Sequence, residues 1–115
     1  MTTLSTHVLD LTIGQPAADV AVRLYRREQH EPTLIAARHT DRDGRARLLD
    51  AGQLTPGPWR LAFEIGVYFA RAGAEGDAPA FLDVVTIDFV VADDGRPYHV
   101  PLLVSPYGYS TYRGS

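Results

Sequence analysis

Two histidines and one arginine are the side chains of this chain whose types suit chemistry near neutral pH. His7 and His99 each lie on an alternating apolar segment, and Arg45 directly follows a turn-prone stretch that ends in Gly44. A neutral imidazole, with a reference pKa of about 6.5, can take a proton from water, and a guanidinium offers planar donors to developing negative charge. The residues alone leave other interpretations open, namely structural histidines and a surface ion pair between Arg45 and Asp41 or Asp43.

The C-terminal residues Tyr112-Arg113-Gly114-Ser115 form a second chemical group. They bring together a phenol, a guanidinium, a hydroxyl and the terminal carboxylate, where most chains fray. We expect this group to line a site. The other two histidines, His30 and His39, lie beside turns or strand ends and are expected to be solvated. None of the four histidines has the spacing of a metal-ligand pair, and the chain has no cysteine, so we expect no metal.

A period-two alternation of apolar residues predicts the strands that position these groups. Strands are predicted over 5–11, 20–25, 34–39, 59–65 and 85–91. A terminal hairpin is predicted within 98–115, with its turn at Pro106-Tyr107-Gly108. The stretch 46–54 is expected to be a short strand that runs into a loop, and 66–74 one or two helical turns. A tight reversal over 40–44, with Gly44 at positive φ, would hold Arg45 on a constrained backbone.

Seven to eight short strands with glycine- and proline-rich turns and one short helix predict an all-β, antiparallel β-sandwich. The 115 residues are expected to form a single domain, 1–115, because they suffice for one core and not for two. One outward face of the penultimate strand carries His99, Pro101, Leu103 and Ser105. This face is too apolar for solvent, so we expect another chain to cover it.

Composition excludes several classes of partner. The formal net charge is −3, and acidic and basic residues are interspersed, which argues against nucleic acid or an anionic membrane surface as partner. The start of the chain has no signal-peptide pattern, and no run of about eighteen apolar residues occurs. With no cysteine to form a disulfide, a cytoplasmic location is expected.

Three stretches together resemble the transthyretin-related 5-hydroxyisourate hydrolases of purine catabolism. They are Leu4-Ser5-Thr6-His7-Val8-Leu9-Asp10, Tyr98-His99-Val100-Pro101-Leu102-Leu103 and the terminal Tyr112-Arg113-Gly114-Ser115. The resemblance implies a transthyretin-like sandwich that assembles as a homotetramer, a dimer of dimers, with the site in a channel between subunits. It also implies cofactor-free hydrolysis of 5-hydroxyisourate to 2-oxo-4-hydroxy-4-carboxy-5-ureidoimidazoline.

The resemblance also implies the site residues. Catalytic roles fall on His7, Arg45, His99 and Ser115, and substrate binding on His7, Arg45, Tyr112, Arg113, Gly114 and Ser115. His99 is assigned as the general base in preference to His7, which would orient water or protonate the departing nitrogen. One departure stands at Phe81-Leu82-Asp83-Val84-Val85, where the family usually has Phe-Phe-Pro-Glu-Val, so the conformation of that loop is left open.

Two other functions remain to be weighed at the level of sequence. The first is a non-catalytic carrier that binds a small aromatic ligand in an intersubunit channel, as transthyretin does. That function leaves two histidines and an arginine in the channel unexplained. The second is a sandwich that only mediates protein contacts, which leaves the terminal tetrapeptide unexplained.

Overall fold

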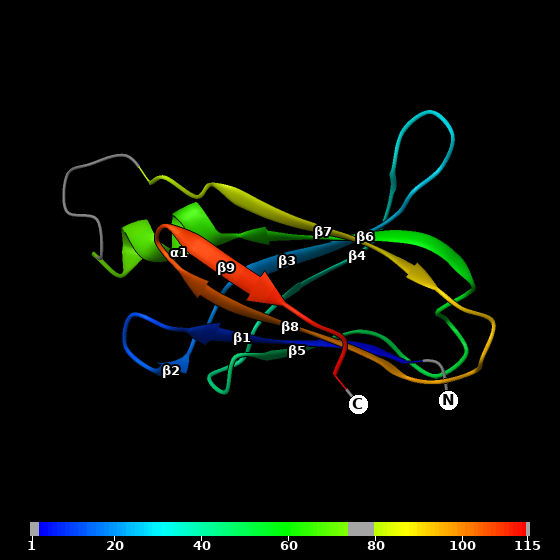
Figure 1. The fold of residues 1–115 in the computed structure, drawn as a ribbon, viewed down its shortest axis with the longest axis horizontal. Helices are drawn as coiled ribbons and strands as arrows, with labels where there is room; N and C mark the ends of the chain where they lie inside the picture. The colour runs from blue at the N-terminus through cyan, green and yellow to red at the C-terminus, as the bar shows by residue number, and fades with distance from the viewer. Residues whose placement is uncertain (1–2, 74–79, 115) are drawn as a thin grey trace.

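Two β-sheets packed face to face, with a short helix at one end, make up the computed structural model, which describes residues 3–73 and 80–114 (Figure 1). The first sheet contains β1 (Leu4–Asp10), β2 (Gln15–Pro16), β5 (Arg45–Leu49), β8 (Tyr98–Ser105) and β9 (Gly108–Thr111). The second contains β3 (Ala21–Arg26), β4 (Thr33–His39), β6 (Gly57–Glu64) and β7 (Val84–Val91). The helix α1 (Ile65–Arg71) follows β6 directly. No helix in the described ranges is long and apolar enough to cross a membrane.

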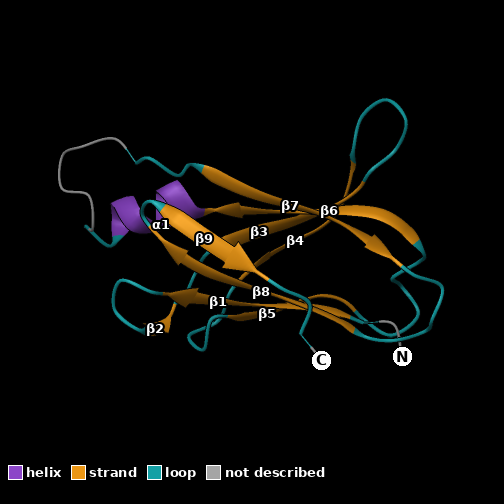
Figure 2. Cartoon of the chain, in the orientation of Figure 1, coloured by secondary structure: helices purple, strands orange, loops and turns teal. Residues whose placement is uncertain are grey.

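The predicted sandwich is confirmed, and Figure 2 shows that strands account for nearly all of its regular structure. The ends of the predicted strands differ from the observed ones by one or two residues, and 46–54 contains one strand, β5, followed by a loop. The helix begins at Ile65, which the sequence places last in the preceding strand. A carbonyl distant in sequence decides this start, because Asp83 accepts the backbone N–H groups of Ile65 and Gly66 at 3.1 and 2.9 Å. The two-residue strand β2 was not predicted from the sequence.

Strand β1 is central to the first sheet. It pairs along its whole length with β8 in parallel, and on its other edge with β5 and then β2 in antiparallel fashion. Period-two alternation gives no strand direction, so the parallel pairing does not follow from the sequence pattern. The registers place Ser5 opposite His99 on one side, and His7 opposite Arg45 on the other. Segments far apart in the chain therefore meet on one face of this sheet.

The core lies between the sheets and takes alternate residues of β1, β3 and β8. On β1 and β8, residues Leu4, Val8, Leu102 and Val104 are fully buried, and their neighbours face outward. Phe63 of β6 and Phe69 of α1 are the largest fully buried side chains. Burial of each such side chain contributes about 1.5–3 kcal/mol, so this packing fixes which face of β1 and β8 carries His7 and His99.

A buried polar contact fastens the helix to β1. The hydroxyl of Tyr68 donates to Asp10 Oδ2 at 2.7 Å, and Asp10 Oδ1 accepts the backbone N–H of Thr12 at 2.9 Å. Asp10 is only 3% exposed, and both of its oxygens have partners. Burial, followed by the bond to Asp10, raises the pKa of Tyr68 to about 12, so the phenol stays a donor.

The segment 81–85, in which the family's usual proline is missing, packs at the start of the helix α1. The Asp83 carbonyl accepts the first N–H groups of the helix, as described above. A Cβ on Gly66 would lie 3.0 Å from the carbonyl oxygen of Leu82, so this close contact favours glycine. The backbone N–H of Leu82 donates to Pro106 O at 3.4 Å, which ties the segment to the β8–β9 turn. The loop residues 74–79 lie outside the described residues.

We predict that Gly44→Ala destabilises the protein more than Gly14→Ala does. Both glycines have positive φ, 75° and 64°, so a Cβ costs about 1–2 kcal/mol at either. A Cβ at Gly14 meets nothing within 4 Å, whereas one at Gly44 would collide with the Val8 carbonyl and lie 3.0 Å from Pro16 Cβ. We expect a further loss of about 1–3 kcal/mol at Gly44, measured by chemical denaturation. Equal losses in the two variants would contradict this prediction.

Candidate active site

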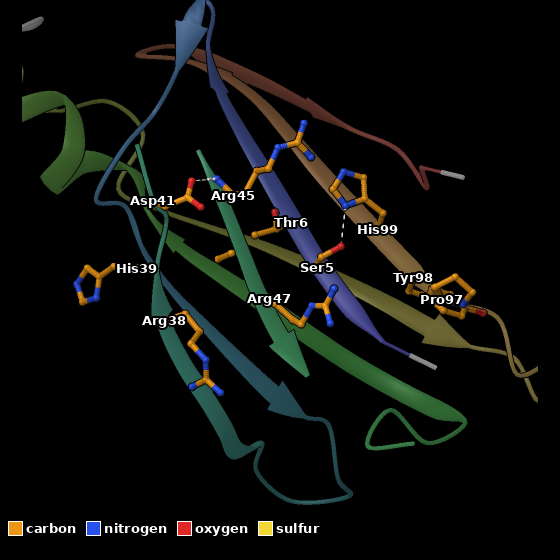
Figure 3. Close-up of a pocket in the computed structure, with 11 residues that line it drawn as sticks. Ser5, Thr6, Arg38, His39, Asp41, Arg45, Arg47, Pro97, Tyr98 and His99 are labelled. Atoms are coloured by element: carbon orange, nitrogen blue, oxygen red, sulfur yellow. Dashed lines mark hydrogen bonds between the residues drawn. The ribbon is translucent and has the colours of Figure 1, made fainter. Parts of the chain in front are cut away.

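A cleft of about 700 Å³ opens on the outer face of the first sheet (Figure 3). Strands β1, β4, β5 and β8 line it, together with the β4–β5 turn and the residue before β8. Its lining residues are Ser5, Thr6, Arg38, His39, Asp41, Arg45, Ala46, Arg47, Pro97, Tyr98 and His99. The cleft therefore holds three guanidinium groups, two imidazoles and one carboxylate.

The β4–β5 turn fixes the backbone of Arg45. The carboxylate of Asp41 accepts the backbone N–H of Asp43 at 2.9 Å and that of Arg45 at 3.0 Å. The carbonyl of Gly44 accepts the N–H of Val8 at 2.7 Å, which anchors the turn against β1. The Asp41 carboxylate therefore holds backbone groups, and within 3–73 and 80–114 no ion pair involves Arg45. Its guanidinium remains available to a ligand in the cleft.

The His99 ring is half-buried and has a defined neighbour on each side. The ring Nδ1 lies 2.9 Å from the Oγ of Ser5, the residue that is paired with His99 in the parallel register of β1 and β8. The backbone N–H of Gly114 donates to the His99 carbonyl at 2.7 Å, and a Cβ on Gly114 would lie 2.7 Å from His99 Cδ2. Only glycine at this position lets the C-terminal segment lie against the ring.

The environment of His99 lowers its pKa below the usual 6.5. Burial is the largest cause, followed by the charges of His7 and Arg45, which oppose a positive charge on the ring. The imidazole is therefore neutral at pH 7 and has a lone pair that can accept a proton. Figure 3 shows the Arg45 side chain and the His99 ring on the same side of the sheet.

His7 is the third predicted site residue on this face. It is half-buried on β1 and pairs with Arg45 across the antiparallel register. Its ring makes no hydrogen bond to any other described residue. It does not line the cleft itself, yet its charge acts on His99. The structure thus brings His7, Arg45 and His99 together from three strands.

The terminal tetrapeptide divides between two places. Gly114 lies against His99, as described, whereas Tyr112 and Arg113 line a second, largely apolar cleft of about 420 Å³. The guanidinium of Arg113 stacks 3.7 Å from the centre of the Tyr98 ring and reaches the Pro97 carbonyl at 3.5 Å. Arg113 therefore anchors the C-terminal segment to the start of β8. Ser115 lies outside the described residues.

Arg45 and His99 are the cleft residues that the sequence predicted as site residues; those it missed include Ser5, Arg38, His39 and Arg47. Ser5 and Arg47 share faces with His7 and Arg45, two residues away on β1 and β5, so the strand period was the signal for them. His39 and Arg38 come from the end of β4, and only the turn of the chain into β5 brings them here. His39 is solvent-exposed, as predicted. No group of three or more histidine, aspartate or glutamate side chains that could hold a metal occurs in the described parts of the chain.

The HIUase/Transthyretin family model matches residues 4–114. The chain belongs to this family. Among its relatives, a 5-hydroxyisourate hydrolase of Caulobacter vibrioides is 52% identical over 115 residues, which is 100% of both chains. The solved 5-hydroxyisourate hydrolase of Klebsiella pneumoniae superposes with a TM-score of 0.81 at 40% identity, and the match covers 99% of this chain and 100% of that one. Sea bream transthyretin in complex with thyroxine superposes with a TM-score of 0.86 at 28% identity, and that match covers 96% and 93% of the two chains.

We predict that Arg45→Gln raises the pKa of His99. Removal of a nearby positive charge favours the protonated ring, while the burial that also depresses the pKa remains. An NMR pH titration of the His99 ring would measure the shift. Arg47→Gln is the matched control, because Arg47 is exposed on the same face of β5 and does not contribute to the lowered pKa. A wild-type pKa at or above 6.5, or equal shifts in the two variants, would contradict the prediction.

Proposed function

We propose that this protein hydrolyses 5-hydroxyisourate to 2-oxo-4-hydroxy-4-carboxy-5-ureidoimidazoline without a cofactor. The observation that carries the proposal is the neutral imidazole of His99 in one cleft with the guanidinium of Arg45, which forms no ion pair with any described residue. Relatives that carry the name 5-hydroxyisourate hydrolase align over the full chain, at 52% identity in the Caulobacter protein. A flat, polar heterocycle suits a cleft that presents guanidinium and imidazole groups more than an apolar wall.

The reaction needs a base, a site for oxyanion charge and a proton for the departing nitrogen. His99 takes a proton from water as the water oxygen attacks the ring amide carbonyl. Arg45 offers N–H donors to the carbonyl oxygen as it gains negative charge. The ring C–N bond then breaks, and the protonated His99 or His7 returns a proton to the nitrogen. The carbonyl carbon stays in the product as a carboxyl group, which releases its proton to solvent, so the ring amide has gained one water in total.

The remaining roles depend on the assembly, which we propose to be a homotetramer with the site in a channel between subunits. The support is the outer face of β8, where His99, Leu103 and Ser105 are only half-buried in the single chain. Tyr112 and Ser115 would then bind substrate or water, in the same or a neighbouring subunit. Arg113 stacks on the Tyr98 ring and Gly114 pairs with the backbone of His99, so both hold the C-terminal segment beside the site.

The two other functions have less support in the structure. A carrier of an apolar aromatic ligand does not require the guanidinium groups of Arg38, Arg45 and Arg47 in its binding cleft. A contact-mediating sandwich does not require a lowered pKa at His99 or a glycine placed against that ring. The hydrolase accounts for both observations.

We predict that purified protein accelerates the ultraviolet decay of freshly generated 5-hydroxyisourate, and that His99→Asn lowers kcat by about two to four decades. Asparagine keeps a hydrogen-bonding group but cannot act as the base, so KM should change less than kcat. His30→Asn is the matched control, because His30 is exposed on the β3–β4 loop and does not line the cleft. All rates are corrected for spontaneous decay.

The same assay gives a pH profile with a defined sign. Because the pKa of His99 is lowered, kcat/KM should fall on acidification as the ring takes up a proton, with the midpoint of the fall below the 6.5 of an ordinary histidine. Arg45→Lys should also lower kcat/KM, since it keeps the charge but loses the planar donor fork. Near-normal turnover by His99→Asn would move the base to His7.

We predict that deletion of Gly114 and Ser115 abolishes turnover and leaves a folded tetramer. The deletion removes the backbone N–H that holds the His99 carbonyl and the residue that contacts its ring, but no core side chain. Light scattering would measure the assembly and circular dichroism the fold. A protein tagged at its N-terminus is the control. Full activity in the truncated protein, or only monomer at micromolar concentration in the intact one, would contradict this prediction.

A further inference from the structure

Two contacts fix the orientation of the His99 ring. Ser5 Oγ meets Nδ1 at 2.9 Å, and the backbone of Gly114 closes the Cδ2 edge. The parallel pairing of β1 and β8 places Ser5 directly opposite His99, so the register of the sheet brings the two side chains within reach of each other. Nε2 is the ring nitrogen that has no hydrogen-bond partner among the described residues. It is therefore the nitrogen that is free to act on substrate or water.

The bond between Ser5 and His99 permits two arrangements of the proton. In the first, the hydroxyl donates to Nδ1, the ring proton is on Nε2, and no lone pair is left for a base at that atom. In the second, Nδ1–H donates to Ser5 Oγ, and Nε2 has the lone pair. A neutral imidazole has one ring N–H, so only the second arrangement gives a base at Nε2.

The charges around the ring favour the second arrangement. The positive charge of Arg45 acts on His99, and a guanidinium has only donors. The partial positive charge of an Nε2–H would be repelled by the positive charge of Arg45, whereas an Nε2 lone pair would be attracted to it. Ser5 Oγ has no other hydrogen bond among the described residues, so its acceptor lone pairs are available to Nδ1–H.

We propose that Ser5 is a positioning residue that accepts the Nδ1–H of His99 and so holds the Nε2 lone pair in the cleft. The inference rests on the proposed function, in which His99 is the general base. Ser5 acts through His99 and takes no part in proton transfer itself. Its loss should therefore reduce the fraction of His99 in the working tautomer, and lower kcat with little change in KM.

The test compares Ser5→Ala with Ser5→Thr, which keeps the γ-oxygen and is well suited to a strand. Selective ¹⁵N labelling of histidine, with assignment by His99→Asn, reports which ring nitrogen of the neutral ring has the proton. We expect Nδ1–H in the wild type and a shift toward Nε2–H in Ser5→Ala. Turnover of Ser5→Ala should fall about tenfold to a hundredfold, with KM changed less than about threefold, and Ser5→Thr should restore both readouts.

Ser105→Ala is the matched control. Ser105 is half-buried on the same face of the sheet, and its hydroxyl contacts only the β8–β9 turn, at Gly108 O and the N–H of Tyr107. We expect this variant to keep the His99 tautomer and wild-type turnover. Light scattering on every variant separates an effect on the ring from an effect on assembly.

The outcomes separate this inference from the proposed function. A wild-type ring with the proton on Nε2, or a Ser5→Ala protein with unchanged tautomer, would overturn the positioning role. Loss of turnover in Ser5→Ala without a change of tautomer would overturn it as well. Absence of turnover in the wild type would instead overturn the proposed function, whereas the ¹⁵N signals would still report the proton position in the His99–Ser5 pair.

Discussion

The parallel pairing of β1 with β8 is the interaction on which the candidate site depends. It joins the two ends of the chain, and it places Ser5 opposite His99 while the other edge of β1 places His7 opposite Arg45. A shift of one residue in either register would turn these side chains into the core. The buried alternation of Leu4, Thr6, Val8 and Asp10 prevents such a shift, so hydrophobic packing on one face fixes the polar chemistry on the other.

Backbone groups and small residues, more than ion pairs, hold the side chains of the candidate site. The Asp41 carboxylate is occupied by main-chain N–H groups of the β4–β5 turn, so it does not neutralise Arg45. Gly44 and Gly114 allow the turn and the C-terminal segment to approach β1 and His99 more closely than a Cβ would permit. The backbone of the site is thereby held rigidly, and the charged ends of its side chains line the cleft.

The electrostatics of the cleft follow from this arrangement. Burial is the largest cause that disfavours a positive charge on His99, and the charges of His7 and Arg45 add to it. Histidine in such a field stays neutral and can act as a base near pH 7. Tyr68 shows the opposite case: burial raises the pKa of its phenol to about 12, and it serves as a fixed donor to Asp10.

The sequence by itself determined the sandwich, the short helix and the terminal hairpin, because these follow from local alternation and turn chemistry. It also marked His7, Arg45 and His99, through their residue types and the family resemblance. Only the tertiary structure decided that β1 and β8 run parallel, that Ser5 meets His99, and that Arg113 is stacked on Tyr98. Residues 94 positions apart meet there, and no local pattern encodes which strand edges pair.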